Sequence, residues 1–206
     1  MRKNLLLINN IYPSVKVIFE KVFNDQDFSE SMKLLSSRFF ARDTLVVAKE
    51  LLGKIIQVNG CSARIIETEA YKDDEASHAF TKTDRSALMY DTYGHVYVYL
   101  IYGMYYCLNF TTEIAGKPGA VLIRGLEPIN GIKKMQQRRG TSEVKNLCSG
   151  PGKLCQALGI DKTLNGTSVG SKLKIYDDGF KPKKIERSRR IGISVAKELE
   201  WRFCVK

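Results

Sequence analysis

The sequence predicts one mixed domain of the α/β class, α+β in type, after a short N-terminal appendage. The chain has 206 residues, of which 44% are hydrophobic and 10% aromatic, which is enough for one domain with an ordinary core. Strand patterns dominate its middle, with helical patterns on either side. No repeat and no linker divides residues 36–206. Residues 1–35 stand apart as the appendage, in which SVKVIFEKVF fits a helix or a strand equally well.

The elements of the domain follow in order. A first helix begins at Asp43 or Thr44, either of which can cap it, and ends at Gly53. Five strands, punctuated by glycine and proline, are expected at 54–57, 64–71, 96–101, 105–110 and 120–126. Two helices come next, a basic one at 132–139 and another at 149–158 that has Pro151 near its first turn. Late strands are expected at 173–176, 191–194 and 201–205.

The chain is strongly basic, with 33 Lys and Arg against 22 Asp and Glu, a net charge of +11. Such an excess is typical of a polyanion partner or an anionic membrane surface, although it also serves solubility alone. The run KPKKIERSRR, residues 181–190, holds six basic residues and one acid. It is either a solvated loop or a surface that contacts DNA phosphates.

Cysteine usage and the N-terminal segment indicate the compartment. The five cysteines are scattered without a C-x-x-C pair, and only two histidines are present, so a zinc site is not expected. The apolar run Leu5–Ile8 is too short for a signal peptide or a membrane span. We therefore expect a cytoplasmic protein that uses neither a metal nor a membrane.

The stretch IIETEAY, residues 65–71, places acids where a strand does not favour them. A period of two puts Ile65, Glu67, Glu69 and Tyr71 on one face. Two glutamates on one strand face repel each other, and neither favours strand formation. A pattern that costs stability in this way raises the question of what the protein gains from it. The spacing alone does not choose between Glu67 and Glu69 as the functional acid.

Six tyrosines lie in the stretch YGHVYVYLIYGMYY, residues 93–106. Alternation places Tyr97 and Tyr99 on one strand face, and the pattern breaks at residues 102–104, which suggests an exposed turn. Clustered tyrosines usually pack in a core or on a sheet face. At a loop tip they can instead stack on unpaired bases or wedge between base pairs, at about 1–3 kcal/mol per stacked base.

The stretch LCSGPGKLCQALG, residues 147–159, can present free backbone N–H groups and one lysine at a helix start. That arrangement suits a phosphate, although an ordinary helix start explains it as well. It is not a nucleotide P-loop, because Leu154 stands where Ser or Thr is required.

Five motifs, in one order, resemble the alkyladenine (3-methyladenine) DNA glycosylase family of base-excision repair. They are ETEAY followed by DEASH, YVYLIYGMYYCLN, VLIRGLEP, LCSGPGKLCQALGI and RIGIS. The resemblance runs from about Ser37 to Val205. It implies a curved antiparallel sheet surrounded by helices. It also implies a monomeric, monofunctional enzyme without metal or cofactor, which removes damaged purines from double-stranded DNA and leaves an abasic site.

The resemblance assigns the chemistry to Glu69 and Arg124. Glu69 would be the general base that activates a water against the anomeric carbon, and its charge would favour an oxocarbenium-like transition state. Arg124 would hold that water, with help from the backbone carbonyl of Ile193.

The resemblance also assigns the handling of the base. Tyr71, Tyr99 and His78 would enclose the flipped base, and His78 would hydrogen-bond its edge. Asn109 would crowd the 2-amino group of normal guanine. Tyr102, with Met104 beside it, would enter the gap in the DNA. These last assignments, too, follow from the family motifs.

Contacts to the DNA backbone are expected from four basic residues: Arg85, Lys153, Lys183 and Arg190. The sequence departs from the family pattern at Ser86, where an asparagine is usual after the arginine, and at Cys204, where an aromatic residue is common. The first departure puts the contacts of its loop in doubt, and the second concerns packing.

Three alternatives remain at this point. The first is a module that binds distorted DNA without cutting it, which would have no use for the acid at position 69. The second is an RNA-binding domain, since basic charge and tyrosines also suit single-stranded RNA. The third, a hydrolase of free nucleosides, does not explain the positive charge.

Overall fold

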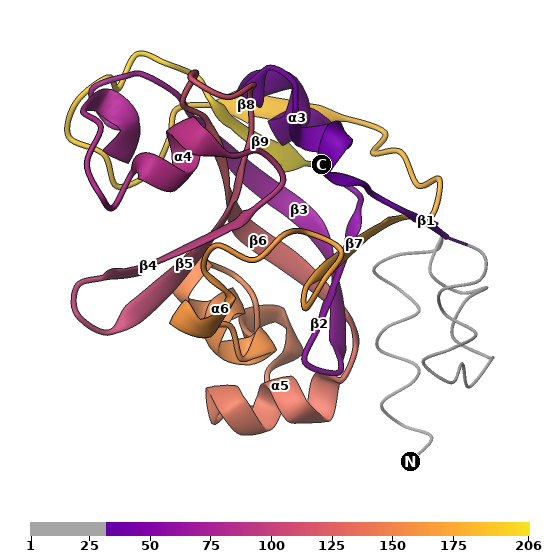
Figure 1. Ribbon diagram of the computed structural model, residues 1–206. Coiled ribbons are helices and arrows are strands. Elements are labelled where there is room, and N and C mark those ends of the chain that lie inside the picture. Colours follow the sequence, from indigo (N-terminus) through magenta and orange to yellow (C-terminus); the bar gives the residue numbers. More distant parts are fainter. Residues whose placement is uncertain (1–31) are drawn as a thin grey trace. The chain divides into compact units, whose positions relative to one another are not determined.

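The computed structural model describes residues 32–206, of which Lys33–Lys206 form one compact unit (Figure 1). Most of the predicted appendage, with the stretch 14–23 that fits a helix or a strand, lies outside the described residues. The sheet takes in residues just before position 36, because Lys33–Leu34 pairs with a later strand. Leu35 lies in the hydrophobic core.

The centre of the unit is a nine-stranded sheet, in which every strand pair is antiparallel. Its order is β1-β7-β2-β3-β6-β5-β4, and β9 pairs with both β3 and β8. The strands are β1 (Lys33–Leu34), β2 (Ile55–Val58), β3 (Cys61–Tyr71), β4 (Val96–Ile101), β5 (Tyr105–Thr111), β6 (Ala120–Asn130), β7 (Lys174–Asp177), β8 (Ile185–Ser188) and β9 (Arg202–Val205). The sheet curls, and helices pack around it (Figure 1), which confirms the predicted fold class.

The long strand β3 organises the sheet. It pairs with β6 from Ser62 to Tyr71, whereas its other edge pairs first with β2 and then, at Glu67–Glu69, with β9. The register with β6 shifts on both sides of Glu67, so that Ile66 and Arg124 have no opposite partner. Such bulges strengthen the local twist and re-aim side chains. The sheet therefore changes neighbours at the stretch where the sequence placed its two acids.

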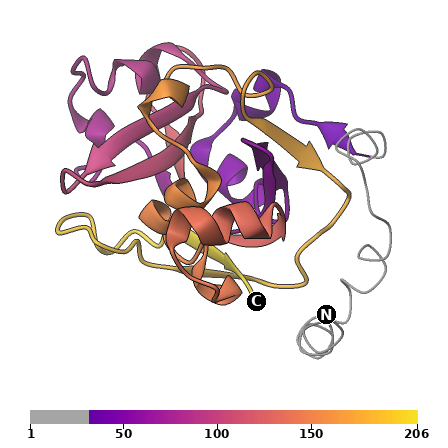
Figure 2. The ribbon, with the colours of Figure 1, turned by 90° about the horizontal axis from the view of Figure 1, so that it is seen from below.

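The α-helices are short: α3 (Thr44–Glu50), α4 (Ala87–Asp91), α5 (Ile132–Arg139) and α6 (Pro151–Leu158). The Asp43 carboxylate caps α3 by accepting the Leu45 and Val46 N–H groups, as the sequence suggested. α3 packs on β3 and β6, while α6 packs on β5 and β6. α5 lies alongside α6 (Figure 2). The predicted bounds of α5 are confirmed.

The main hydrophobic core joins α3, α6 and the sheet. Its fully buried large side chains include Phe40, Leu51, Phe110, Leu154 and Phe203. Burying a side chain of this size stabilises the fold by about 1.5–3 kcal/mol. Ile65 belongs to this core and not to the face of Glu67 and Glu69, because the register shift lies between them.

Two late elements differ from the prediction. Residues 191–194 form no strand, because Gly192 has a φ of 80° and the Ile191 N–H bonds to a side chain. The strand β8 lies instead at Ile185–Ser188, within the basic run. A single apolar residue among charged ones gives no alternating pattern, so this strand and the five-residue helix α4 left no clear signal in the sequence.

Candidate active site

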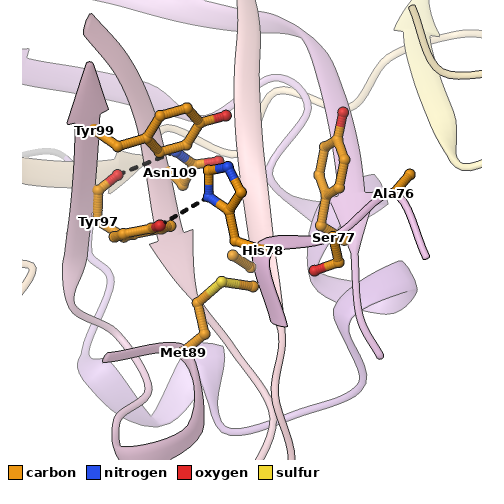
Figure 3. Close-up of a pocket in the computed structure, with 9 residues that line it drawn as sticks. Ala76, Ser77, His78, Met89, Tyr97, Tyr99 and Asn109 are labelled. Carbon is orange, nitrogen blue, oxygen red and sulfur yellow. Dashed lines mark hydrogen bonds between the residues drawn. The ribbon is translucent and has the colours of Figure 1, made fainter. Parts of the chain in front are cut away.

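A groove of about 610 Å³ opens between β3, the β4–β5 hairpin, the start of α6 and the segment 191–193. A volume of this size is typical of a small-molecule or base-sized site. Tyr71, His78, Arg85, Tyr99 and Arg124 line it. A smaller cavity of about 30 Å³ shares Tyr71, His78 and Tyr99 with the groove (Figure 3). The structure thus brings together the predicted catalytic and base-binding residues.

Glu69 lies directly behind the wall of this groove, with a side chain that is 0% exposed. Its Oε1 accepts a hydrogen bond from the Ile191 N–H at 2.8 Å. Its Oε2 accepts one from the Tyr71 hydroxyl at 2.9 Å and lies 3.4 Å from a terminal nitrogen of Arg124. A carboxylate offers about four acceptor positions, so one remains for a further donor such as water. The three residues that hold Glu69 all line the groove.

The surroundings of Glu69 shift the pKa of its carboxyl in opposite directions. Burial raises the pKa of its carboxyl above the ordinary value, while Arg124, the Ile191 N–H and the Tyr71 hydroxyl oppose the rise. Burial also raises the pKa of the Tyr71 hydroxyl, and the Glu69 charge raises it further, so that Tyr71 remains a hydrogen-bond donor. The three donors favour the ionised form of Glu69, and burial makes this carboxylate a stronger base.

Glu67 pairs with two arginines. Its Oε1 accepts the Nε–H of Arg202 at 2.6 Å and the Nε–H of Arg124 at 3.2 Å. The sequence offered Glu67 as the alternative to Glu69 and did not identify Arg202 as its partner. Arg202 lies on β9 opposite Glu69 in the strand register. Nothing in the sequence indicated that two strands 135 residues apart would meet there.

Three aromatic rings stand together at the inner end of the site (Figure 3). The His78 ring lies 4.5 Å from the Tyr99 ring, and its Nδ1 is 2.9 Å from the Tyr97 hydroxyl. Burial, and then the Arg85 guanidinium, lower the pKa of His78 to about 4, so the imidazole is neutral near pH 7. Tyr97 is thus a pocket residue that sequence reasoning placed on the right strand face without assigning it to the site. Its ring lies 5.4 Å from that of Tyr99.

Asn109 is buried at the wall of the smaller cavity. Its Nδ2 donates to the backbone carbonyls of Tyr97, at 3.1 Å, and of Cys107, at 3.4 Å. Both amide hydrogens are therefore engaged, which fixes the side chain against the pocket (Figure 3).

The tip of the β4–β5 hairpin exposes two large side chains. Tyr102 is 77% exposed and Met104 is 66% exposed. Tyr102 has a φ of 54° and Gly103 a φ of 68°, both in the left-handed region. A tyrosine held there costs of order 1–3 kcal/mol, and strain of this kind gathers at functional sites. The turn presents the Tyr102 ring outwards beside the groove. Ile101, at the end of β4, and Tyr105, at the start of β5, also line the groove.

Of the four basic residues expected at the DNA backbone, Arg85, Lys153 and Lys183 are exposed. Arg190 is not: its side chain is 0% exposed and pairs with Asp74 at 2.6 Å. Its guanidinium lies 4.7 Å from the centre of the Tyr71 ring and 5.1 Å from that of Trp201. The expectation of a phosphate contact from Arg190 does not fit this position, because its charge is already buried and paired.

The two departures from the family pattern have local roles. Ser86 is fully buried, and its hydroxyl accepts the Thr83 N–H at 2.8 Å and lies 3.0 Å from the Thr81 carbonyl oxygen. Ser86 therefore closes its own loop beside Arg85. Cys204 lies on β9 opposite Glu67 and is partly buried.

Within residues 32–206, no group of three or more His, Cys, Asp or Glu side chains is placed to hold a metal ion. None of the helices in that part of the chain is long and apolar enough to cross a membrane.

The similarity to known proteins covers the part of the chain that forms this domain. The family model for methylpurine-DNA glycosylase matches residues 38–206. A relative from Rhizobium johnstonii is 48% identical over 172 residues, which cover 82% of this chain and 84% of the relative. One from Clostridium perfringens is 45% identical over 195 residues, covering 84% and 95%. One from Desulfitobacterium hafniense is 43% identical over 192 residues, also covering 84% and 95%. All three carry the name "Putative 3-methyladenine DNA glycosylase".

Proposed function

Because the chain belongs to the methylpurine-DNA glycosylase family, we propose that it is a monofunctional DNA-3-methyladenine glycosylase of base-excision repair. It flips an alkylated or deaminated purine out of duplex DNA and hydrolyses the N-glycosidic bond. The products are the free base and an abasic site. The enzyme works as a monomer on DNA in a bacterial-type cytosol, and the compact unit 33–206 forms its glycosylase domain.

The first step is extrusion of the damaged nucleotide. Flipping costs a few kcal/mol, and least for a base that is damaged or mispaired. The exposed, strained Tyr102 is suited to enter the gap, as an inserted side chain does in other DNA-kinking proteins. Met104 widens the apolar tip. Arg85, Lys153 and Lys183 bind the phosphates of the DNA backbone through their positive charge.

The second step is recognition of the base in the groove. Tyr71, Tyr99 and the neutral His78 enclose it. The faces of aromatic rings attract the positive charge of an alkylated purine. Asn109, held by two backbone carbonyls, excludes the 2-amino group of normal guanine by crowding.

The third step is hydrolysis. A water in the free acceptor position of Glu69 attacks the anomeric carbon, its proton passes to the carboxylate, and the bond from carbon to base breaks with its electron pair on the base. The negative charge of Glu69 also stabilises the positive charge that develops on the sugar. Arg124 and the carbonyl of Ile193 orient the water.

The observation that carries this proposal is the buried Glu69 carboxylate. Three groups that line an aromatic groove hold it by hydrogen bonds, and one acceptor position remains. A domain that only bound DNA or RNA would gain nothing from burying an acid beside the phosphates of its ligand, since the charge repels them.

The proposal is tested with duplexes that contain a single hypoxanthine or a single 7-methylguanine. Free base is measured by chromatography, and abasic sites by strand cleavage in alkali. Release from both duplexes, and none from an undamaged duplex of the same sequence, is the expected result. Tight binding without release would favour the binding module. A requirement for the 2′-hydroxyl in a binding assay would favour an RNA-binding domain.

A further inference from the structure

Two acids and two arginines meet at the point where β3, β6 and β9 adjoin. Glu67 and Glu69 belong to β3, Arg124 to β6 and Arg202 to β9. The proposed mechanism uses Glu69 and Arg124 and leaves the other pair without a function. Yet Glu67 and Arg202 are linked at 2.6 Å, a shorter contact than either bond made by Arg124.

The bonds of Arg124 divide its guanidinium between the two acids. Its Nε–H points to Glu67, at 3.2 Å, and a terminal nitrogen points to Glu69, at 3.4 Å. Arg124 occupies the register shift in β6, so no partner opposite it on β3 constrains its backbone. The orientation of its side chain therefore depends on the acids that it contacts.

We propose that Glu67 and Arg202 are positioning residues: Arg202 binds Glu67 and limits its pull on Arg124, so that Arg124 stays in contact with Glu69. Both Nε–H groups bond to the same oxygen of Glu67. Arg202 thus takes up much of the attraction that Glu67 would otherwise exert on Arg124. This inference rests on the proposed function, in which Glu69 is the base.

The charged and titratable groups that face Glu69 come from every element around it. On β3 they are Glu67 and Tyr71; on the other elements they are Arg124 of β6, Cys107 of β5 and Arg202 of β9, while Arg190, paired with Asp74, lies over the ring of Tyr71. Of these, Glu67 and Arg202 can be changed without removing a direct hydrogen bond to Glu69.

Glu67→Gln and Arg202→Gln should act in opposite directions. Loss of the Glu67 charge removes a like charge and frees Arg124 to approach Glu69, so the pKa of Glu69 falls. Loss of Arg202 leaves Glu67 to draw Arg124 away from Glu69, so the pKa of Glu69 rises. A change of one charge at this range shifts a pKa by about one unit.

The experiment measures the single-turnover rate of 7-methylguanine release, at saturating enzyme, as a function of pH. That base leaves without needing a proton, so the loss of rate at low pH comes from protonation of Glu69 and of His78. Neither Glu67 nor Arg202 contacts His78, so a shift of the midpoint between variants reports on Glu69. The midpoint of this loss should move upward by about one pH unit in Arg202→Gln and downward by about one unit in Glu67→Gln. It should return near the wild-type value in the double variant and in Arg202→Lys. Arg187→Gln, on the neighbouring β8, is the matched control with an unmoved midpoint.

Midpoints that coincide in all variants, whatever their melting temperatures, would overturn the inference and leave Glu67 and Arg202 a structural role only. Shifts of the same sign in both single variants would overturn it as well. No release by the wild type would overturn the proposed function and this inference with it, so the two failures are distinguishable.

Discussion

Glu69 accepts a hydrogen bond at 2.8 Å from the backbone N–H of Ile191, a residue 122 positions later in the chain. This bond joins the C-terminal part of β3 to the irregular segment between β8 and β9. It places Ile191 and Ile193 on the wall of the groove, beside the carboxylate. It also explains why residues 191–194 are not a strand: their first donor serves the acid, and Gly192 then turns the chain. The contact with Glu69 therefore helps to set the conformation of the segment 191–193.

Replacement of Tyr102 by alanine should separate flipping from chemistry. The ring is largely exposed, so the free energy of unfolding should change by less than about 0.5 kcal/mol. Release of hypoxanthine from a fully paired duplex should fall by about 5- to 150-fold, because loss of a stacking contact costs about 1–3 kcal/mol. The loss should be smaller when the base opposite the lesion is missing. Single-turnover rates on the two duplexes check this.

The matched control for that variant is Tyr93→Ala. Tyr93 is 38% exposed and precedes β4, whereas Tyr102 follows it. Its loss should leave release unchanged. Equal losses in both variants would show that Tyr102 has no special part in flipping.

Replacement of Asp74 by alanine should destabilise the fold strongly. It leaves the guanidinium of Arg190, which is 0% exposed, without its carboxylate partner. Breaking a buried ion pair in this way costs about 3–5 kcal/mol. Asp91→Ala breaks the exposed pair with Lys82 and should cost no more than about 1 kcal/mol.

Urea denaturation of the two variants measures the difference. Asp74→Ala combined with Arg190→Met should recover part of the lost stability, since it removes the unpaired charge. A small, equal loss in both single variants would contradict the assignment of Arg190 as a buried structural residue.

His78 should titrate far below the ordinary histidine value. Its folded pKa is about 4 against 6.5 for a free side chain. The unfolded chain therefore binds a proton that the folded one does not between those pH values, and His78 makes the fold less stable as the pH falls from 6.5 towards 4. An NMR titration of the imidazole, assigned with His78→Gln, should give a midpoint near 4. A midpoint near 6.5 would show that the ring is protonated during recognition at mildly acidic pH.

The sequence predicted those parts of the fold that local patterns encode. The cap at Asp43, the strand bounds at Val96–Ile101 and the helix Ile132–Arg139 follow from capping, alternation and periodicity. β8 was not predicted, because a strand of mostly charged, exposed residues shows no alternation of polar and apolar residues. The face of Ile65 was also wrong, since the register shift beside Ile66 interrupts a pattern that the sequence alone treats as regular.

The site could be predicted where motifs carry it, and less so where the chain folds back on itself. Family motifs selected His78 and Arg124, which line one groove, and Glu69, which lies directly behind its wall in contact with Arg124. Arg202 could not be found, because its partner lies 135 residues away and a lone arginine in a strand has many uses. Arg190 was mistaken for a surface contact, since a basic run does not reveal which member is buried.

The central claim is that Glu69 is the general base that activates water in a DNA glycosylase. It is tested most directly by Glu69→Gln. The substitution keeps the size of the side chain and an acceptor for the Ile191 N–H, but it removes the charge. The 7-methylguanine duplex should bind this variant as tightly as the wild type, while the single-turnover release of base should fall by at least about 100-fold, the scale of one general base. Release that remains within a few fold of the wild type, at equal binding, would contradict the account.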